Sequence, residues 1–395
     1  MKTALDQWIR EQEGIPAVTR ASIEAVQLKK LNLLLKREKV RSGFYQNLPD
    51  HLEDLKQLQE LPFTTEKEFR EQGHRMLLLS QSQIERVRTE LTSGTTGAAK
   101  RMFYSENDNN RTVSFFAAGL SELVHPGEKT MICMPFSKDR GLGELISEAI
   151  VKLGAIPLKT GIGRTYGELM DVLETEKPQT YVGMPVPLLS LLRLKPDNSL
   201  ERALISGDTC AKTVEKEIEG LLGTRLYPHY GSREIGLGGA VTCPAFCGMH
   251  LRENDMIAEI VDEHGMVLPY GEWGELVLTT IQAEAMPLIR YRTGDHTRIY
   301  REPCPCGSVL LRLDQVTRMG DQKEMAELDE KFFSYPWIID YCAAFKENKI
   351  KVQGYVTEAG REPLPVQWKG ISIEYKWTVA DRKKQPCYLG KRRML

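Results

Sequence analysis

Polar and apolar positions along the first sixty residues repeat with the period of a helix. Apolar side chains recur at helical spacing within residues 23–35, as expected for a helix with one buried face. A second helix start is predicted within residues 62–70, where a threonine precedes a first turn rich in acidic residues. The N-terminal region is therefore expected to be helical.

From about residue 85 to 240, short apolar runs alternate with helical patterns. The predicted strands are residues 130–134, 155–158, 180–183 and 202–206, and the predicted helices are residues 143–153, 166–174 and 185–194. This alternation favours layered α/β structure with parallel strands. Ligands of such sheets bind beyond the carboxyl ends of the strands, where Ser206-Gly207-Asp208 and Tyr230-Gly231-Ser232 fall.

The pattern becomes β-rich between residues 250 and 300. Residues 257–261 and 274–280 flank a turn-like segment at 262–265, which predicts antiparallel strands. A further unit begins near Asp321, with a helical pattern over 324–340 and strands at 349–356 and 371–377. We expect a large N-terminal α/β domain (1–319), with a β-rich subdomain at about 241–318, and a small α+β C-terminal domain (320–395).

Composition narrows the function classes. The chain has 395 residues, 41% hydrophobic and 27% charged, with a net charge of -1, so no basic field favours nucleic acid. No apolar run approaches the roughly 18 residues of a membrane helix, and the first residues lack the apolar core of a signal peptide. A cytoplasmic protein without nucleic-acid or membrane partners is predicted.

One loop concentrates hydroxyl groups and glycine. It runs from Leu91 to Lys100 as Leu-Thr-Ser-Gly-Thr-Thr-Gly-Ala-Ala-Lys. Glycine allows close backbone approach, so backbone N–H groups and hydroxyls could surround phosphate oxygens. The Walker motif is excluded because Ala99 precedes Lys100 and Arg101 follows it. Taken alone, the loop could equally be a polar surface turn.

Cysteine spacing suggests a metal site. Of eight cysteines, Cys243 and Cys247 lie just before His250, and Cys304 and Cys306 follow about fifty residues later. Thiolates and imidazole are the ligands of structural zinc. Five candidates compete for four positions, and the alternative is reduced cysteines in turns. The scattered Cys133, Cys210, Cys342 and Cys387 are interpreted as core or incidental residues.

Three motifs in order carry a family resemblance. The loop at residues 92–100, the Tyr-Gly-Ser-Arg-Glu at 230–234 and the Tyr-Arg-Thr-Gly-Asp at 291–295 resemble the signatures of adenylate-forming enzymes. Residues 61–65, 284–293, 248–250 and 303–307 resemble segments of the phenylacetate-CoA ligase-like group of that superfamily. The resemblance implies a large N-terminal adenylate-forming domain and a small, trimmed C-terminal domain.

The resemblance also implies roles for individual residues. Phosphate contacts would come from Thr92, Ser93, Gly94, Thr95, Thr96, Gly97 and Lys100. Glu234 would hold Mg²⁺, a hard cation that prefers carboxylate and phosphate oxygens. Tyr230, Gly231 and Ser232, with Gly207 and Asp208, would form the purine pocket, and Asp295 would bind the ribose. The plainer alternatives are a surface carboxylate at Glu234 and a core tyrosine at Tyr230.

Further assignments concern the C-terminal region and one position, residue 233, at which this sequence departs from the family pattern. Lys391, in a Gly-Lys motif, would reach the α-phosphate and the substrate carboxylate, unless it is part of a solvated basic tail. Arg318 and Asp321 resemble the arginine and aspartate at the junction of the two domains. Arg233 stands where the family has Thr or Ser, and with Thr92 it is assigned to the catalytic set; it could contact phosphate or signal altered substrate geometry.

For zinc, the resemblance selects Cys243, His250, Cys304 and Cys306, with Cys247 in reserve. The predicted function is ATP-dependent conversion of a carboxylic acid to acyl-AMP, then transfer to coenzyme A. The acid is expected to be aromatic or apolar from Met134, Phe136, Tyr181 and Met184, although core packing would explain these residues equally well.

Several alternatives remain open at this level. Relatives continue past the Asp321 position with an Arg-Gly hairpin that is missing here, so a carrier-protein thiol, an amine or a protein side chain could accept the acyl group. A nucleotide-binding homologue with weak turnover is a further alternative. The expected cofactors are ATP/AMP, Mg²⁺, structural Zn²⁺ and coenzyme A. The expected partners are the acid, an acyl carrier protein in the alternative reaction, and a second copy in a homodimer.

Overall fold

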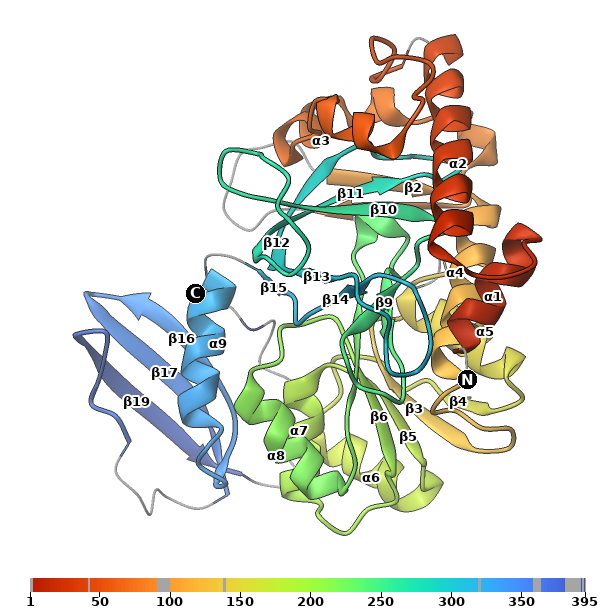
Figure 1. Cartoon of the computed structure of the whole chain (residues 1–395). Helices are drawn as coiled ribbons and strands as arrows, with labels where there is room; N and C mark the ends of the chain where they lie inside the picture. The colour runs from red at the N-terminus through yellow and green to blue at the C-terminus, as the bar shows by residue number, and fades with distance from the viewer. Residues whose placement is uncertain are drawn as a thin grey trace. The chain divides into compact units, whose positions relative to one another are not determined.

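The structure is a computed structural model that describes residues 3–41, 43–90, 100–137, 140–318, 321–357, 364–380, 392 and 394 (Figure 1). The chain forms two compact units. The first unit comprises Met1–Glu122 and His229–Val316, and the second comprises Leu123–Pro228 and Thr317–Leu395. No helix in the described ranges is both long enough and apolar enough to cross a membrane. The cytoplasmic location stays a prediction.

Helices dominate the N-terminal part of the first unit. They are α1 (Ala4–Glu13), α2 (Arg20–Arg41), η1 (Leu55–Glu60), α3 (Glu66–Gln72), η2 (Gly73–Met76), η3 (Gln81–Gln83) and α4 (Glu106–Leu120). The helix expected within residues 23–35 is confirmed as part of α2. Thr65 caps α3 in a capping box with Glu68, as the threonine followed by acidic residues predicts.

Antiparallel strands form the rest of the first unit. Strands β1 (Arg86–Glu90) and β2 (Lys100–Tyr104) pair with each other. Strands β10 (Met256–Val261), β11 (Gly274–Thr280) and β12 (Tyr291–Thr297) form an antiparallel sheet, which confirms the pairing expected around residues 262–265. A second ladder runs through β8 (Ala240–Thr242), β9 (Met249–Leu251), β14 (Arg312–Leu313) and β13 (Ile299–Tyr300).

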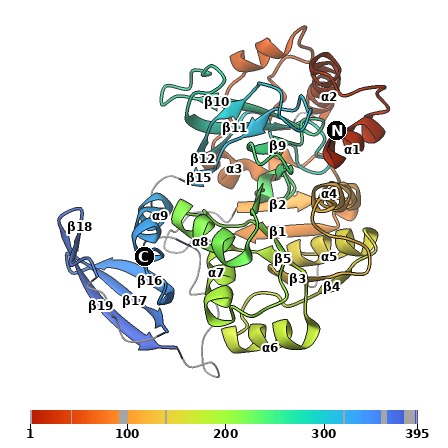
Figure 2. The same cartoon turned by 60° about the horizontal axis from the view of Figure 1, so that its bottom comes forward.

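The second unit contains the predicted parallel layers (Figure 2). Its strands β3 (Lys129–Cys133), β4 (Ile156–Leu158), β5 (Thr180–Gly183) and β6 (Arg202–Ile205) lie in the order β4-β3-β5-β6, all parallel. The first residues of β7 (Tyr227–Tyr230) continue the order beside β6. The helices are α5 (Leu142–Lys152), α6 (Tyr166–Glu176), α7 (Pro185–Leu194) and α8 (Lys212–Leu222). The strand and helix predictions for this region are confirmed.

The C-terminal segment adds a helix and a small sheet to the second unit. After β15 (Thr317–Arg318) come α9 (Asp321–Phe332), β16 (Ile338–Lys346), β17 (Lys349–Val356), β18 (Gln367–Trp368) and β19 (Ile371–Val379). The helix expected over residues 324–340 is wrong beyond Phe332, because the segment from Ile338 onward is strand. Pro336 disfavours helical backbone at Tyr335, and the β-branched Ile338 and Ile339 favour the strand.

This segment shares one apolar core with the parallel layers. Phe332, Ile338 and Tyr341 are buried in the same cluster as residues of α7 and α8, and Figure 1 shows α9 beside α8. The Arg193 guanidinium donates to the carbonyl of Ile338 at 2.6 Å. The contacts therefore group residues 317–395 with residues 123–228. The predicted division into an N-terminal domain (1–319) and a mobile C-terminal domain (320–395) stays a prediction.

Candidate active site

The β1–β2 hairpin frames the predicted phosphate loop. Glu90 and Lys100 are paired at the open ends of the two strands. The loop residues between them, Thr92, Ser93, Gly94, Thr95, Thr96 and Gly97 included, lie outside the described residues. The hairpin therefore fixes where the chain enters and leaves the loop.

Lys100 and Glu234 form an ion pair. Their side chains are only 4% and 11% exposed, and the ammonium of Lys100 also donates to the hydroxyl of Tyr291 at 2.9 Å. Burial by itself would raise the pKa of the Glu234 carboxyl, but the charge of Lys100 and the hydrogen bonds to the carboxylate lower it below its ordinary value. The ammonium of Lys100, from the first motif, thus contacts Glu234 of the second motif and Tyr291 of the third.

The backbone around Glu234 is tightly folded. Glu234 lies in the short helix η4 (Arg233–Ile235), and a Cβ at Gly231 would come within 1.9 Å of the Leu237 carbonyl oxygen. Only glycine fits at position 231. The side chain of Arg233 is exposed, while its carbonyl accepts a hydrogen bond from Tyr104 at 2.6 Å. The turn thus presents the carboxylate inward and the arginine outward.

Tyr230 and Asp295, the predicted adenine and ribose residues, contact each other. The hydroxyl of Tyr230 donates to Asp295 at 2.8 Å, and both residues are buried. Thr293 supports this arrangement, since its hydroxyl accepts from the backbone N–H of Asp295 at 3.0 Å and donates to the Leu276 carbonyl. The structure thus brings the second and third sequence motifs together within the first unit.

Gly207 and Asp208 belong to the second unit. Gly207 follows β6 with φ of +86°, a conformation that favours glycine. The carboxylate of Asp208 accepts from the backbone N–H groups of Thr209 at 3.0 Å and Arg392 at 2.9 Å. Lys391 lies outside the described residues, but its covalent neighbour Arg392 is bound at the end of β6.

Arg392 is fully buried and held by charge. Its guanidinium donates from two nitrogens to Asp329 and from a third to the Tyr341 carbonyl at 2.5 Å. Asp340 lies 3.5 Å from the same guanidinium. This anchor was missed at the sequence level, because a buried arginine within the basic run Lys391-Arg392-Arg393 looks the same in sequence as a solvated one.

Other predicted residues are also located. Arg318 lies in β15 and Asp321 begins α9, with residues 319 and 320 between them outside the described ranges. Tyr181 is a core residue, fully buried, and its hydroxyl donates to the Met184 carbonyl at 3.1 Å. Packing therefore accounts for Tyr181, whereas the sulfur of Met134 and the side chain of Met184 flank Gly207.

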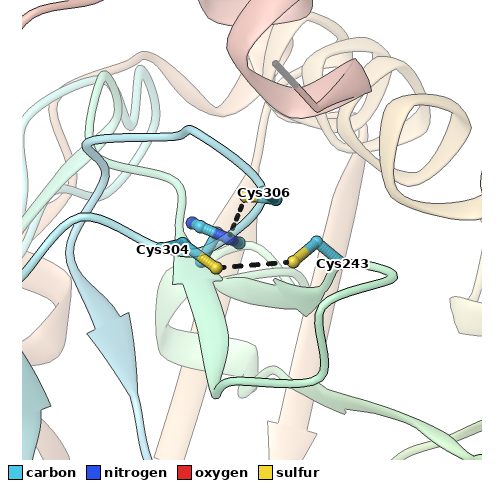
Figure 3. Close-up of side chains that lie close together, drawn as sticks. Cys243, Cys304 and Cys306 are labelled. Atoms are coloured by element: carbon cyan, nitrogen blue, oxygen red, sulfur yellow. Dashed lines mark hydrogen bonds between the residues drawn. The ribbon is translucent and has the colours of Figure 1, made fainter. Parts of the chain in front are cut away.

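Four of the five predicted metal ligands converge in the first unit. Candidate ligand atoms of Cys243, His250, Cys304 and Cys306 all lie within 4.8 Å of one another. The Cys243 and Cys304 sulfurs are 3.7 Å apart, and the Cys306 sulfur is 3.5 Å from His250 Nε2 (Figure 3). The thiol of Cys247, the reserve candidate, instead donates to the Ala245 carbonyl.

Burial shapes the ionisation of this cluster. It raises the pKa of the Cys243 and Cys306 thiols and lowers the pKa of His250 to about 4. The cluster joins the chain just after β8, strand β9 and the loop between β13 and β14. It therefore ties together three segments of the β-rich part.

Comparison with known proteins agrees with this fold and these motifs. A family model described as "AMP-binding enzyme" matches residues 89–283, so the chain carries an AMP-binding domain. Its fold resembles that of a 2-hydroxyisobutyryl-CoA ligase in the postadenylation state, with a TM-score of 0.77 over 95% of this chain and 90% of that one, at 17% identity. The fold therefore matches that of the adenylate-forming CoA ligases.

Two relatives found by sequence comparison carry the same enzyme name. The phenylacetate-coenzyme A ligase of Thermus thermophilus is 27% identical over 328 residues, covering 78% of this chain and 73% of that protein. The enzyme of the same name from Escherichia coli strain K12 is 28% identical over 285 residues, covering 69% of this chain and 64% of that protein. The chain is therefore a homologue of the phenylacetate-coenzyme A ligases.

Proposed function

We propose that this protein is an AMP-forming acid–thiol ligase. The observation that carries the proposal is the meeting of Lys100, Glu234 and Tyr291 in one buried contact, beside the Tyr230–Asp295 pair. A cation to bind phosphate, a carboxylate for a hard metal ion and a carboxylate for ribose are the groups that ATP requires. Homology to named phenylacetate-coenzyme A ligases supports the same reaction class.

In the first half-reaction, a carboxylate oxygen of the acid attacks the α-phosphorus of ATP. The bond from that phosphorus to the bridging oxygen breaks, and pyrophosphate leaves with the electron pair. Lys100 and the loop at 92–97 would bind the β- and γ-phosphates, and Lys391 would stabilise charge at the α-phosphate. Thr92 and Arg233 are assigned to the same group of phosphate contacts.

Glu234 fits the magnesium role, because its lowered pKa keeps the buried carboxylate charged. Bound there, Mg²⁺ would supply positive charge to the phosphate oxygens. In the second half-reaction, the sulfur of coenzyme A would attack the acyl carbon and release AMP. We propose an aromatic or apolar acid, which the methionines flanking Gly207 support.

The test is carboxylate-dependent exchange of labelled pyrophosphate into ATP. We expect exchange with at least one acid from a panel of aryl and aliphatic acids, and a loss of about a hundredfold or more in Lys391→Ala. Coenzyme A should then convert the adenylate to a thioester. ATP binding without exchange across the panel would favour a nucleotide-binding homologue with weak turnover. A carrier-protein acceptor and a homodimer stay predictions.

The cysteine cluster supports a structural zinc site. At the tetrahedral angle, two thiolates about 2.3 Å from one ion lie roughly 3.7 Å apart, and a thiolate and an imidazole nitrogen about 3.5 Å apart. The cluster has both separations. We expect about one zinc ion per chain by mass spectrometry of metals, lost in Cys304→Ser with a lower melting temperature. Cys342→Ser, outside the cluster, should keep the zinc; a zinc-free wild type would contradict the assignment.

A further inference from the structure

The ammonium of Lys100 lies between two aromatic rings. Lys100 Nζ is 5.3 Å from the ring centre of Phe69 and 5.3 Å from that of Tyr291, within the range of cation–π attraction. The two rings meet edge to face with their centres 5.9 Å apart. Together with the Tyr291 hydroxyl at 2.9 Å, the two rings form a seat for the ammonium in addition to its contact with Glu234.

This seat is fixed by a contact between two distant motifs. Thr64 pairs with Tyr291 in an isolated parallel bridge. The backbone N–H of Thr64 donates to Arg290, and that of Arg292 donates to Thr64, at 2.9 and 3.0 Å. Because Thr65 caps α3, which carries Phe69, the same segment sets the position of both rings. Phe69 and Tyr291 are 1% and 2% exposed, so neither ring can turn away without disrupting the core.

We propose that Tyr291 and Phe69 are positioning residues for Lys100, which they hold in a single orientation before ATP binds. The inference rests on the proposed contact of Lys100 with the ATP phosphates. Lysine has a flexible four-carbon side chain. Ordering that side chain when ATP binds costs free energy and weakens binding. The hydroxyl and the two rings order the ammonium without neutralising it, because all three are uncharged. They add no negative charge to that of Glu234, which already pairs with the ammonium.

The experiment is ATP titration by calorimetry, with steady-state kinetics in parallel. In Tyr291→Phe, which removes only the hydroxyl, we expect the Kd and KM for ATP to rise about five- to tenfold. The value of kcat should change little, because the lysine is retained. Phe69→Leu keeps an apolar core residue but removes one ring, and a two- to fivefold rise is expected as an order of magnitude. If Tyr291→Phe fails to fold, Phe69→Leu still tests the inference.

A double-mutant cycle separates positioning from general damage. In a Lys100→Met background, Tyr291→Phe should change ATP affinity by less than about twofold, because its effect acts through the lysine. Tyr300→Phe is the matched control, since it removes a hydroxyl bonded to Asp314 in the same unit. It should leave ATP affinity unchanged.

The outcomes are distinct. Wild-type affinity in both Tyr291→Phe and Phe69→Leu, with weakened binding in Lys100→Met, would overturn the inference and leave the proposed function intact. An equal loss from Tyr291→Phe with and without Lys100 would also overturn it. Absence of ATP binding by the wild type would overturn the proposed function and this inference together.

Discussion

Lys100 and Arg392 are both buried cations paired with a carboxylate, but they are held differently. Lys100 meets Glu234 and Tyr291 through one ammonium, and Glu234 keeps 11% of its side-chain surface exposed. Arg392 is bonded to Asp329 through two nitrogens and to the Tyr341 carbonyl through a third, and Asp329 is only 1% exposed. A compact ammonium can exchange partners, whereas a planar guanidinium fork is fixed by its geometry.

The difference separates a binding centre from a clamp. Lys100 adjoins the loop predicted to contact phosphate, where under the proposed function its ammonium would exchange Glu234 for phosphate oxygens. Arg392 directly follows the predicted catalytic lysine, and its backbone N–H is bound to Asp208 at 2.9 Å. We therefore expect changes at the first pair to alter ligand affinity, and changes at the second to alter stability.

The largest effect is expected from Asp329→Asn. The substitution removes the carboxylate charge that two guanidinium nitrogens contact and leaves Asp340 at 3.5 Å, so we expect a loss of about 3–5 kcal/mol in the free energy of unfolding. Urea denaturation followed by circular dichroism measures this. Glu217→Gln is the matched control: Glu217 pairs with Arg193 at 3.0 Å but is 34% exposed, so a loss below about 1 kcal/mol is expected. Equal losses in the two variants would contradict the clamp.

A smaller loss of stability, about 1–2 kcal/mol, is expected from Glu234→Gln. The carboxylate that is removed is 11% exposed, and the ammonium left behind keeps the Tyr291 hydroxyl at 2.9 Å. Because the pKa of Glu234 is lowered in the folded protein, the stability that this carboxylate contributes is lost as the pH falls, so Glu234→Gln should differ least from the wild type at acidic pH. Denaturation at several pH values tests this.

The control for that variant is Lys100→Met combined with Glu234→Gln. Both variants lack the Glu234 carboxylate, so their stability should show the same pH dependence. If Glu234→Gln instead costs as much as Asp329→Asn, and its difference in stability from the wild type does not change with pH, the distinction between an exchangeable pair and a clamp fails.

Local sequence patterns predicted most of the elements, because helices and strands follow periodicities of a few residues. The error at residues 338–340 arose where a helical pattern ran past Pro336. The convergence of Cys243, His250, Cys304 and Cys306 was predictable, because a family resemblance selected these four from five residues of zinc-ligand type. The seat of Lys100 was not, since Lys100 and Tyr291 are 191 residues apart and no periodicity links them.

The bridge between Thr64 and Tyr291 has a consequence for synthesis of the chain. Thr64 bonds to the carbonyl of Ile289, 225 residues later, and the first unit is assembled from two separate stretches. A ribosome adding about 5–20 residues per second needs about 11–45 s to cover that distance. For that interval, Thr64 and the adjoining helix α3 lack their partner strand β12. The N-terminal segment of the nascent chain therefore lacks this partner, and its apolar side chains stay uncovered, until β12 leaves the exit tunnel.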